Sequence, residues 1–156
     1  MKFPEIGKKA PAFTLLNQNE EKVSLADFLG KKVVIYFYPK ASTPGCTVQA
    51  CGIRDTQAEL EALNTVVLGI SPDAPVRLKN FTTKKELNFT LLSDVDHAVA
   101  DKYGVWGPKK FMGRVFDGIH RITFIVDAKG KLRHIMEKVK TKTHHDDVIA
   151  YIKEHL

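Results

Sequence analysis

Cysteine is scarce in this chain, which has only Cys46 and Cys51 among its 156 residues. Two cysteines are too few to stabilise a domain of this size through disulfide cross-links. Such cross-links are also not needed, because 44% hydrophobic residues, including 9% aromatics, supply enough apolar surface for a core. The same composition excludes a disordered or low-complexity chain. The two thiols must therefore be explained by packing or by reactivity.

Long hydrophobic runs are absent as well. The longest apolar stretch, VVIYFY at 33–38, is far shorter than the roughly 20 residues of a membrane-spanning helix. The first residues, MKFPEIGKKAPAF, carry charges and proline where a secretory signal needs an uninterrupted apolar segment. We therefore expect a cytoplasmic protein, in a reducing compartment where paired cysteines are more often catalytic, redox-sensing or metal-binding than structural.

The chain also lacks a concentrated basic segment, although its formal net charge is +6 and its pI is about 9.3. Its lysine pairs are dispersed, and no stretch combines aromatic residues with a sustained basic run, as a platform for single-stranded nucleic acid does. The excess charge predicts a solvated, solubilising surface. We expect neither nucleic acid nor a membrane as a partner.

What the sequence does contain is an alternation of strand and helix patterns, which predicts a single α/β domain over residues 1–156, with a mixed sheet flanked by helices. The β-branched and aromatic run 33–38 is typical of a central strand buried on both faces. The other expected strands are a hairpin within 12–25, then 66–70, 90–92, 121–126 and 131–136. One helix is expected to begin at Pro44 and to keep apolar positions on one face as far as residue 63, and further helices are expected over about 75–87, 95–103 and 144–155. We expect residues 104–120 to be irregular.

Cys46 lies where a helix is predicted to begin. Thr43 suits the N-cap and Pro44 the first helical position, so Cys46 falls in the first turn, where unpaired N–H groups and the helix dipole favour a thiolate. A free thiol is only about 3% ionised at pH 7, and the dipole alone is too weak to make it mostly thiolate. A nearby cation is therefore also expected.

Three basic residues are candidates for that cation. Arg121 opens a predicted strand, and if this strand runs antiparallel to the central one, Arg121 lies beside the loop that carries Cys46. Arg54 and Lys40 are the alternatives. From the residues alone, Arg121 is equally well explained as a charge at the edge of the sheet.

The segment PKASTPGC at 39–46 has the P-x-x-x-T-x-x-C pattern of the peroxiredoxins, placed between a strand and a helix as in that family. Together with TPGCTVQACGIRD at 43–55, LLSDVDHAVADKYGVWG at 91–107 and DGIHRITFIVDAKG at 117–130, it closely resembles the bacterioferritin comigratory protein, or peroxiredoxin Q, subfamily. The resemblance implies a thioredoxin-like fold and the reduction of hydrogen peroxide and organic hydroperoxides at a peroxidatic cysteine. It also implies thioredoxin as the usual electron donor, no metal or organic cofactor, and a monomer.

The resemblance makes Cys46 the peroxidatic cysteine and places Pro39, Thr43 and Arg121 around it. These residue types suit the cleavage of an O–O bond, because preorganised donors must hold the peroxide in line while charge develops on the leaving oxygen. The Thr43 hydroxyl, the Cys46 N–H and the Arg121 guanidinium are such donors. The rigid ring of Pro39, which has no N–H, suits a wall that limits the access of water. Thr43 has a simpler alternative role, as an N-cap alone.

Cys51 resembles the resolving cysteine that many members of the subfamily have five positions after the peroxidatic one, and its alternative role is that of a buried core thiol. In a continuous helix the two Cα atoms lie roughly 8.6 Å apart. A disulfide requires at most about 7 Å. The helix must therefore unwind locally to form a Cys46–Cys51 bond, and Gly45 and Gly52, both poor helix formers, lower the cost.

Gln49 is a departure from the family pattern. It stands three positions after Cys46, where many peroxiredoxins have Glu. An amide keeps the capacity for hydrogen bonding but lacks the negative charge. Any role of a carboxylate at this position is therefore in doubt for this chain.

One polar cluster invites a metal-binding interpretation. His144, His145, Asp146 and Asp147 are adjacent residues at the start of a predicted helix. Adjacent helical residues do not converge on one ion, and acidic groups near a helix N-terminus are ordinary partners of the dipole. We therefore expect no metal site here.

Two other kinds of protein also use a reactive pair of cysteines. A protein thiol–disulfide oxidoreductase usually carries C-x-x-C, whereas four residues separate Cys46 from Cys51. A redox-sensing binding module would react with peroxide only at the slow rate of a free cysteine. The rate of reaction with peroxide separates these functions from a peroxidase.

Overall fold

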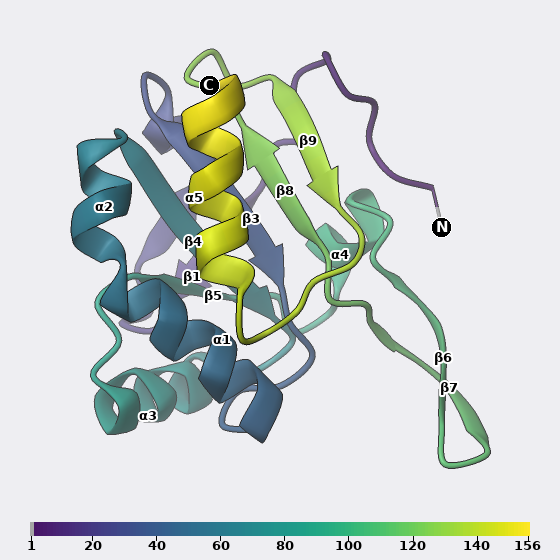
Figure 1. Cartoon of the computed structure of the whole chain (residues 1–156). Coiled ribbons are helices and arrows are strands. Elements are labelled where there is room, and N and C mark those ends of the chain that lie inside the picture. The colour runs from purple at the N-terminus through teal and green to yellow at the C-terminus, as the bar shows by residue number, and fades with distance from the viewer. Residues whose placement is uncertain (1) are drawn as a thin grey trace.

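A seven-stranded mixed sheet crosses the structure, a computed structural model that describes residues 2–156 (Figure 1). The strands of this sheet are β1 (Thr14–Asn17), β2 (Lys22–Ser24), β3 (Lys32–Phe37), β4 (Thr65–Ser71), β5 (Thr90–Ser93), β8 (Thr123–Val126) and β9 (Leu132–Met136). Their order is β2-β1-β5-β4-β3-β8-β9; β3, β4 and β5 are parallel, and the outer strands join through antiparallel pairs. The predicted mixed sheet and its N-terminal hairpin, β1–β2, are confirmed.

Helices cover both faces of this sheet. The larger helices, α1 (Pro44–Asp55), α2 (Gln57–Ala62), α3 (Pro75–Lys85) and α5 (His144–His155), pack on one face, and η1 (Leu25–Phe28) and α4 (Ala98–Lys102) pack on the other. The single helix expected to run from Pro44 past residue 60 is broken at Thr56. The Thr56 hydroxyl donates to the Gly52 carbonyl at 2.9 Å, at the end of α1.

β3 joins the two halves of the core. Val33, Ile35 and Phe37 pack into the cluster on the α4 side, whereas Val34 and Tyr36 pack into the cluster beneath α1 and α5. All five side chains are buried, as expected for a central strand. The chain leaves the sheet at the end of β3 and reaches α1 through a short loop, which places the start of α1 at this end of the sheet.

The expectation that residues 104–120 are irregular is wrong. β6 (Trp106–Phe111) and β7 (Arg114–Ile119) form a separate two-stranded hairpin, which projects from the body of the molecule (Figure 1). Met112 and Gly113 make its turn with φ angles of 51° and 79°, the backbone that closes a tight hairpin. Glycine, proline and consecutive lysines interrupt the alternating pattern here, so strand propensity gave no signal.

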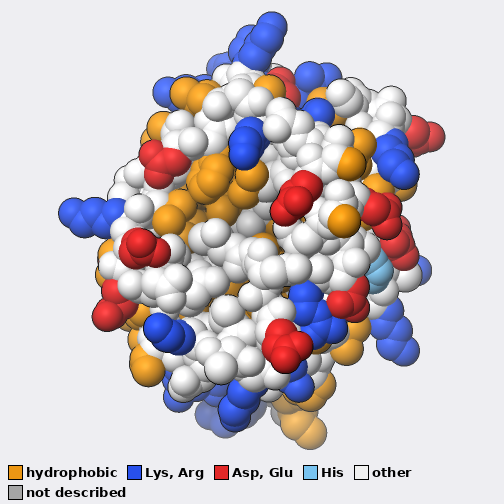
Figure 2. Space-filling view, turned by 90° about the vertical axis from the view of Figure 1, so that its left-hand side faces the viewer, with side chains coloured by type: hydrophobic (Ala, Val, Ile, Leu, Met, Phe, Trp, Pro, Cys, Tyr) orange, Lys and Arg blue, Asp and Glu red, His pale blue; other side chains and the backbone are white. Residues whose placement is uncertain are grey.

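The surface carries mixed charge. Basic and acidic side chains are interspersed over the face shown in Figure 2, in agreement with the dispersed charge of the sequence. Within residues 2–156, none of the helices combines the length and the apolar character needed to cross a membrane.

Candidate active site

Cys46 lies in the first turn of α1, next to the end of β3, as the sequence predicted. Thr43 occupies the N-cap position and Pro44 opens the helix. The Cys46 side chain is only 2% exposed and packs into the cluster beneath α1 and α5. Because the N–H groups of a first turn have no partners within the helix, they favour negative charge on this sulfur.

Arg121 reaches Cys46 from the segment that enters the neighbouring strand, β8. β8 runs antiparallel to β3, and the Phe37 N–H donates to the Ile122 carbonyl at 3.0 Å. This pairing places Arg121, just before β8, beside the end of β3. Arg121 Nη2 donates to Cys46 Sγ at 3.3 Å. β8 itself begins at Thr123, two residues later than expected, so Arg121 lies in the segment that enters the strand.

The two alternative cations lie elsewhere. Arg54, near the far end of α1, pairs with Asp55 at 2.9 Å and donates to the Lys85 carbonyl at 2.6 Å. Lys40 is exposed in the loop before α1. Arg121 is therefore the guanidinium that contacts the thiol.

Thr43 and Pro39 lie in the loop between β3 and α1. The Thr43 hydroxyl donates to the Lys40 carbonyl at 2.7 Å and makes no capping bond to the helix, so the N-cap role expected of its side chain is not observed. Because its proton is used in this bond, the hydroxyl does not donate to a peroxide, as the sequence had led us to expect, but its oxygen is free to accept a hydrogen bond. Pro39 is half-buried.

Gln49 and His144 extend the site, and sequence reasoning did not place His144 there. Gln49 is fully buried and accepts a hydrogen bond from Arg121 Nη1 at 2.5 Å. Its amide nitrogen lies 3.1 Å from His144 Nδ1, and His144 Nε2 lies 2.8 Å from the Thr123 hydroxyl. A chain of hydrogen bonds therefore connects the thiol, through Arg121, to α5 and β8.

The direction of these hydrogen bonds defines the protonation state of the His144 imidazole. Gln49 accepts with its carbonyl oxygen from Arg121, so its amide nitrogen donates to His144 Nδ1, and His144 Nε2 donates to Thr123. Only a neutral imidazole can accept at Nδ1. Burial, and to a lesser extent the neighbouring His145 and Arg121, lowers the pKa of His144 to about 3. The amide of Gln49 is thus matched to an uncharged histidine.

This buried histidine predicts a pH dependence of stability. Below its ordinary pKa of about 6.5, the unfolded chain binds a proton at His144 that the folded protein excludes, so the free energy of unfolding falls as the pH is lowered toward 3. Between pH 6.5 and 4.5 the loss is roughly 2–3 kcal/mol. In urea unfolding at a series of pH values, His144→Gln should flatten this slope. His155→Gln, exposed at the other end of α5, is the control and should keep it; an unchanged slope in His144→Gln would contradict the assignment.

Cys51 is five positions further along an intact helix. Both cysteines are free thiols, and α1 is continuous between them. Cys51 is half-buried, whereas Cys46 is buried. The structure is therefore the helical state from which any local unwinding must start.

Gly52 has a packing role that its low helix propensity did not suggest. A Cβ atom at this position would overlap the ring of His145, so the missing side chain allows α5 to lie directly on the backbone of α1. α5 therefore contacts α1 on either side of Cys51, through His144 at Gln49 and through His145 at Gly52. Unwinding between the cysteines must disturb these contacts, which favours the helical state while the thiols are reduced.

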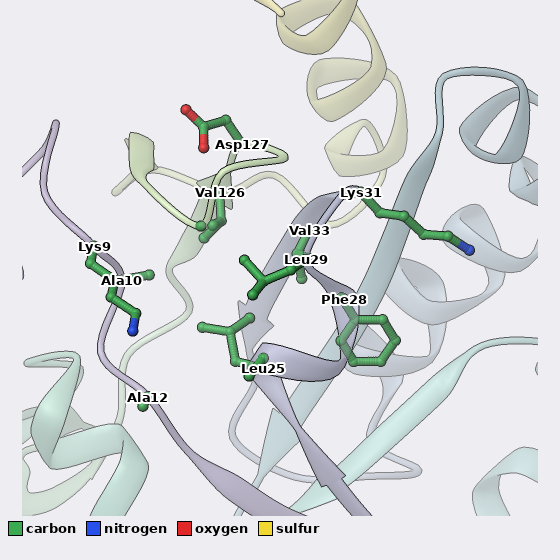
Figure 3. A pocket seen from close by; sticks show the side chains of 12 residues that line it. Lys9, Ala10, Ala12, Leu25, Phe28, Leu29, Lys31, Val33, Val126 and Asp127 are labelled. Atoms are coloured by element: carbon green, nitrogen blue, oxygen red, sulfur yellow. The ribbon is translucent and has the colours of Figure 1, made fainter.

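An apolar pocket lies at the opposite end of β3 (Figure 3). Val33 and Val126, which pair at the start of β3, line it together with Leu25 and Leu29, while the charged end of Lys31 points away. Cys46 follows the other end of this strand. The pocket is therefore separate from the thiol site.

Comparison with known proteins agrees with this geometry. The model of the AhpC/TSA family matches residues 6–135, which include both cysteines and Arg121. The chain belongs to this family. The chain is 63% identical to the putative peroxiredoxin Bcp of Haemophilus influenzae, over 95% of this chain and 96% of the relative. It is 56% identical to peroxiredoxin Bcp of Escherichia coli K12, over 96% of each.

Solved structures give the same result. A structure of the bacterioferritin comigratory protein of Xanthomonas campestris, described for its alkyl peroxide reduction activity, has a TM-score of 0.89 at 32% identity and covers 97% of this chain and 99% of that one. The thioredoxin-like fold and the subfamily resemblance are confirmed. The chain is therefore a thiol-dependent peroxidase of the peroxiredoxin kind, which takes a peroxide as substrate and a thiol as reductant.

Proposed function

We propose that Cys46 is the peroxidatic cysteine and that Arg121, Thr43 and Pro39 surround the bound peroxide. The observation that carries this proposal is the 3.3 Å hydrogen bond from Arg121 Nη2 to a thiol in the first turn of a helix. A guanidinium and a helix N-terminus act on the same sulfur, and both favour the thiolate, which is the nucleophile.

In the first step, the Cys46 thiolate attacks one oxygen of the hydroperoxide. An S–O bond forms as the O–O bond breaks, and the leaving oxygen takes up a proton to depart as water or an alcohol. Arg121 and the Cys46 N–H stabilise the charge as it passes from sulfur to oxygen, and the Thr43 oxygen accepts a hydrogen bond from the peroxide O–H. Pro39 limits the access of water. Cys46 is left as a sulfenic acid.

In the second step, Cys51 acts as the resolving cysteine. Its thiol attacks the sulfenic sulfur, water leaves, and an intramolecular disulfide forms. Because the two Cα atoms of a helix lie roughly 8.6 Å apart and a disulfide requires at most about 7 Å, α1 unwinds between the cysteines and its contacts with α5 loosen. A dithiol reductant then supplies two electrons, and α1 refolds.

We also propose that the chain works as a monomeric single domain over residues 1–156 in the cytoplasm, with thioredoxin as its reductant. The subfamily resemblance supports the monomer and the reductant. One sheet that includes strands from Thr14 to Met136 supports the single domain.

Burial argues against a general protein thiol–disulfide oxidoreductase. With 2% of its side chain exposed, Cys46 cannot meet a disulfide on another protein while α1 is folded. A hydroperoxide group is small and needs only the donors already placed around the sulfur. Donors placed around the sulfur accelerate its reaction with peroxide, and this rate separates a peroxidase from a redox-sensing module that reacts no faster than a free cysteine.

Cys51→Ser tests this cycle. The variant is expected to consume one equivalent of peroxide per chain and then stop in the presence of thioredoxin and its reductase, because no intramolecular thiol captures the sulfenic acid. Dimedone labelling with mass spectrometry should detect the trapped sulfenic acid on Cys46. Ala58→Ser, an exposed position on α2, is the control and should turn over normally. Full turnover by Cys51→Ser would remove the resolving role.

A further inference from the structure

The β6–β7 hairpin carries exposed apolar side chains on a projecting element. Phe111, Met112, Val115 and Phe116 are 66%, 86%, 72% and 47% exposed. Single exposed hydrophobic residues are ordinary, but a group of them at the end of a hairpin that stands away from the body marks an interaction site (Figure 1).

In the register of the hairpin, each of the three apolar residues in its strands lies opposite a cation. Phe116 lies opposite Lys109, Val115 opposite Lys110 and Phe111 opposite Arg114. Cross-strand partners share a face, and successive pairs alternate between faces, so both faces present apolar and basic groups together.

The cations near the tip are free to meet an external anion. Among residues 2–156, Lys110 and Arg114 form no ion pair. Lys109 is half-buried and donates to the Ile119 carbonyl at 2.7 Å, toward the base. The hairpin's carboxylate, Asp117, is also near the base, opposite Pro108.

Met112 forms the apex in a conformation that its side chain does not favour. Its φ of 51° lies in the left-handed region, which suits Asn, Asp or Gly in such turns. At 86% exposure, the side chain makes little contact within the chain that would offset this strain. The apex thus presents an apolar group outward at a conformational cost.

We propose that this hairpin docks the protein on an anionic lipid bilayer, with Phe111 and Met112 entering the acyl boundary and Lys110 and Arg114 meeting the headgroup phosphates. An apolar apex followed by cations matches the order of groups in the bilayer, where the acyl chains lie beneath the headgroup phosphates. A convex tip with both faces exposed suits a deformable lipid interface better than a flat protein patch. The dispersal of basic residues along the sequence had predicted no membrane partner; the hairpin gathers several of them in space.

The position of the hairpin relates docking to the thiol site. β7 ends at Ile119, two residues before Arg121, and Lys109 donates to the Ile119 carbonyl at 2.7 Å. The base of the hairpin therefore adjoins the thiol site. This part of the inference rests on the proposed function and places the peroxidase at the membrane surface.

Co-sedimentation with vesicles tests the docking. The wild-type protein is expected to sediment with vesicles of equal parts phosphatidylglycerol and phosphatidylcholine, and much less with phosphatidylcholine alone. The double variant Phe111→Ser/Met112→Ser should lower the bound fraction at least about tenfold. Lys110→Gln/Arg114→Gln, a second and independent variant, should lose the preference for phosphatidylglycerol. Val76→Ser/Val95→Ser removes two exposed valines elsewhere and is the control, expected to bind as the wild type does.

Failure of the wild type to bind phosphatidylglycerol vesicles at low ionic strength would overturn the proposal, as would equal binding by the Phe111→Ser/Met112→Ser variant. A tip variant that raises the KM for thioredoxin and leaves vesicle binding intact would assign the hairpin to a protein partner instead. Peroxide consumption by the wild type is measured separately without vesicles. Its absence would refute the proposed function and leave the docking result standing.

Discussion

Cys46→Ser is expected to abolish peroxide consumption, with the rate falling to that of buffer containing an equal concentration of free cysteine. The serine hydroxyl is not ionised at neutral pH, and it cannot form the sulfenic acid on which the cycle depends. The measurement is peroxide loss together with Trp106 fluorescence after mixing reduced protein with substoichiometric peroxide.

The substitution should leave the fold intact. Serine is close to cysteine in size, and its hydroxyl can accept the hydrogen bond that Arg121 Nη2 donates to Cys46 Sγ. The matched control is Cys51→Ser, which makes the same chemical change on the same helix and should retain one turnover. Rapid peroxide consumption by Cys46→Ser would show that the reaction occurs at another residue.

Arg121→Met is expected to lower the second-order rate constant for oxidation of Cys46 by about 10²–10³-fold, the usual effect of removing one preorganised donor to a developing charge. Methionine retains much of the apolar stem but removes Nη2, which contacts the sulfur, and Nη1, which contacts Gln49. Stopped-flow mixing with peroxide in the absence of a reductant isolates this step from recycling.

Two further variants sharpen the test. Arg54→Met makes the same change near the far end of α1, where the guanidinium contacts Asp55, and should leave the rate unchanged. Arg121→Lys keeps the charge but loses the planar fork that contacts Cys46 and Gln49 together, so an intermediate rate is expected. Equal rates for the wild type and Arg121→Met would exclude the guanidinium from the oxidation step.

Arg121→Met should also affect stability, because it leaves a buried acceptor without its donor. Gln49 has no exposed surface, and its side-chain oxygen accepts from Arg121. An unsatisfied buried polar group costs about 1–3 kcal/mol. Urea unfolding of each variant therefore accompanies the rate measurement, so that a loss of rate is compared at equal folded fraction.

The sequence determined the local frame of the site. A run of β-branched and aromatic residues specified the central strand, and Thr43 followed by Pro44 specified where α1 begins and hence that Cys46 lies in its first turn. α5 has the predicted bounds, His144–His155. These features depend on interactions between residues close in the chain, which is why propensity and spacing were sufficient.

His144 shows where that reasoning stopped. It lies four residues before Val148 and eight before Ile152, on the buried stripe of α5, so its burial was readable from the helical period. Its partner was not, because Gln49 is 95 positions away and meets it only when α5 packs on α1. The sequence reasoning considered His144 only as a possible metal ligand; the helical period could have indicated its burial, but not the hydrogen bonds that keep it neutral.

The sequence by itself determined which residues are candidates for the chemistry: a thiol at a helix start, a second thiol five positions later, and an arginine entering a neighbouring strand. Only the tertiary structure decided which groups satisfy the buried polar atoms around that thiol and which apolar residues stay outside the core. Both outcomes depend on how distant elements pack. The packing of α5 on α1 makes the Gln49–His144 contact, and the projection of β6–β7 leaves Phe111 and Met112 exposed.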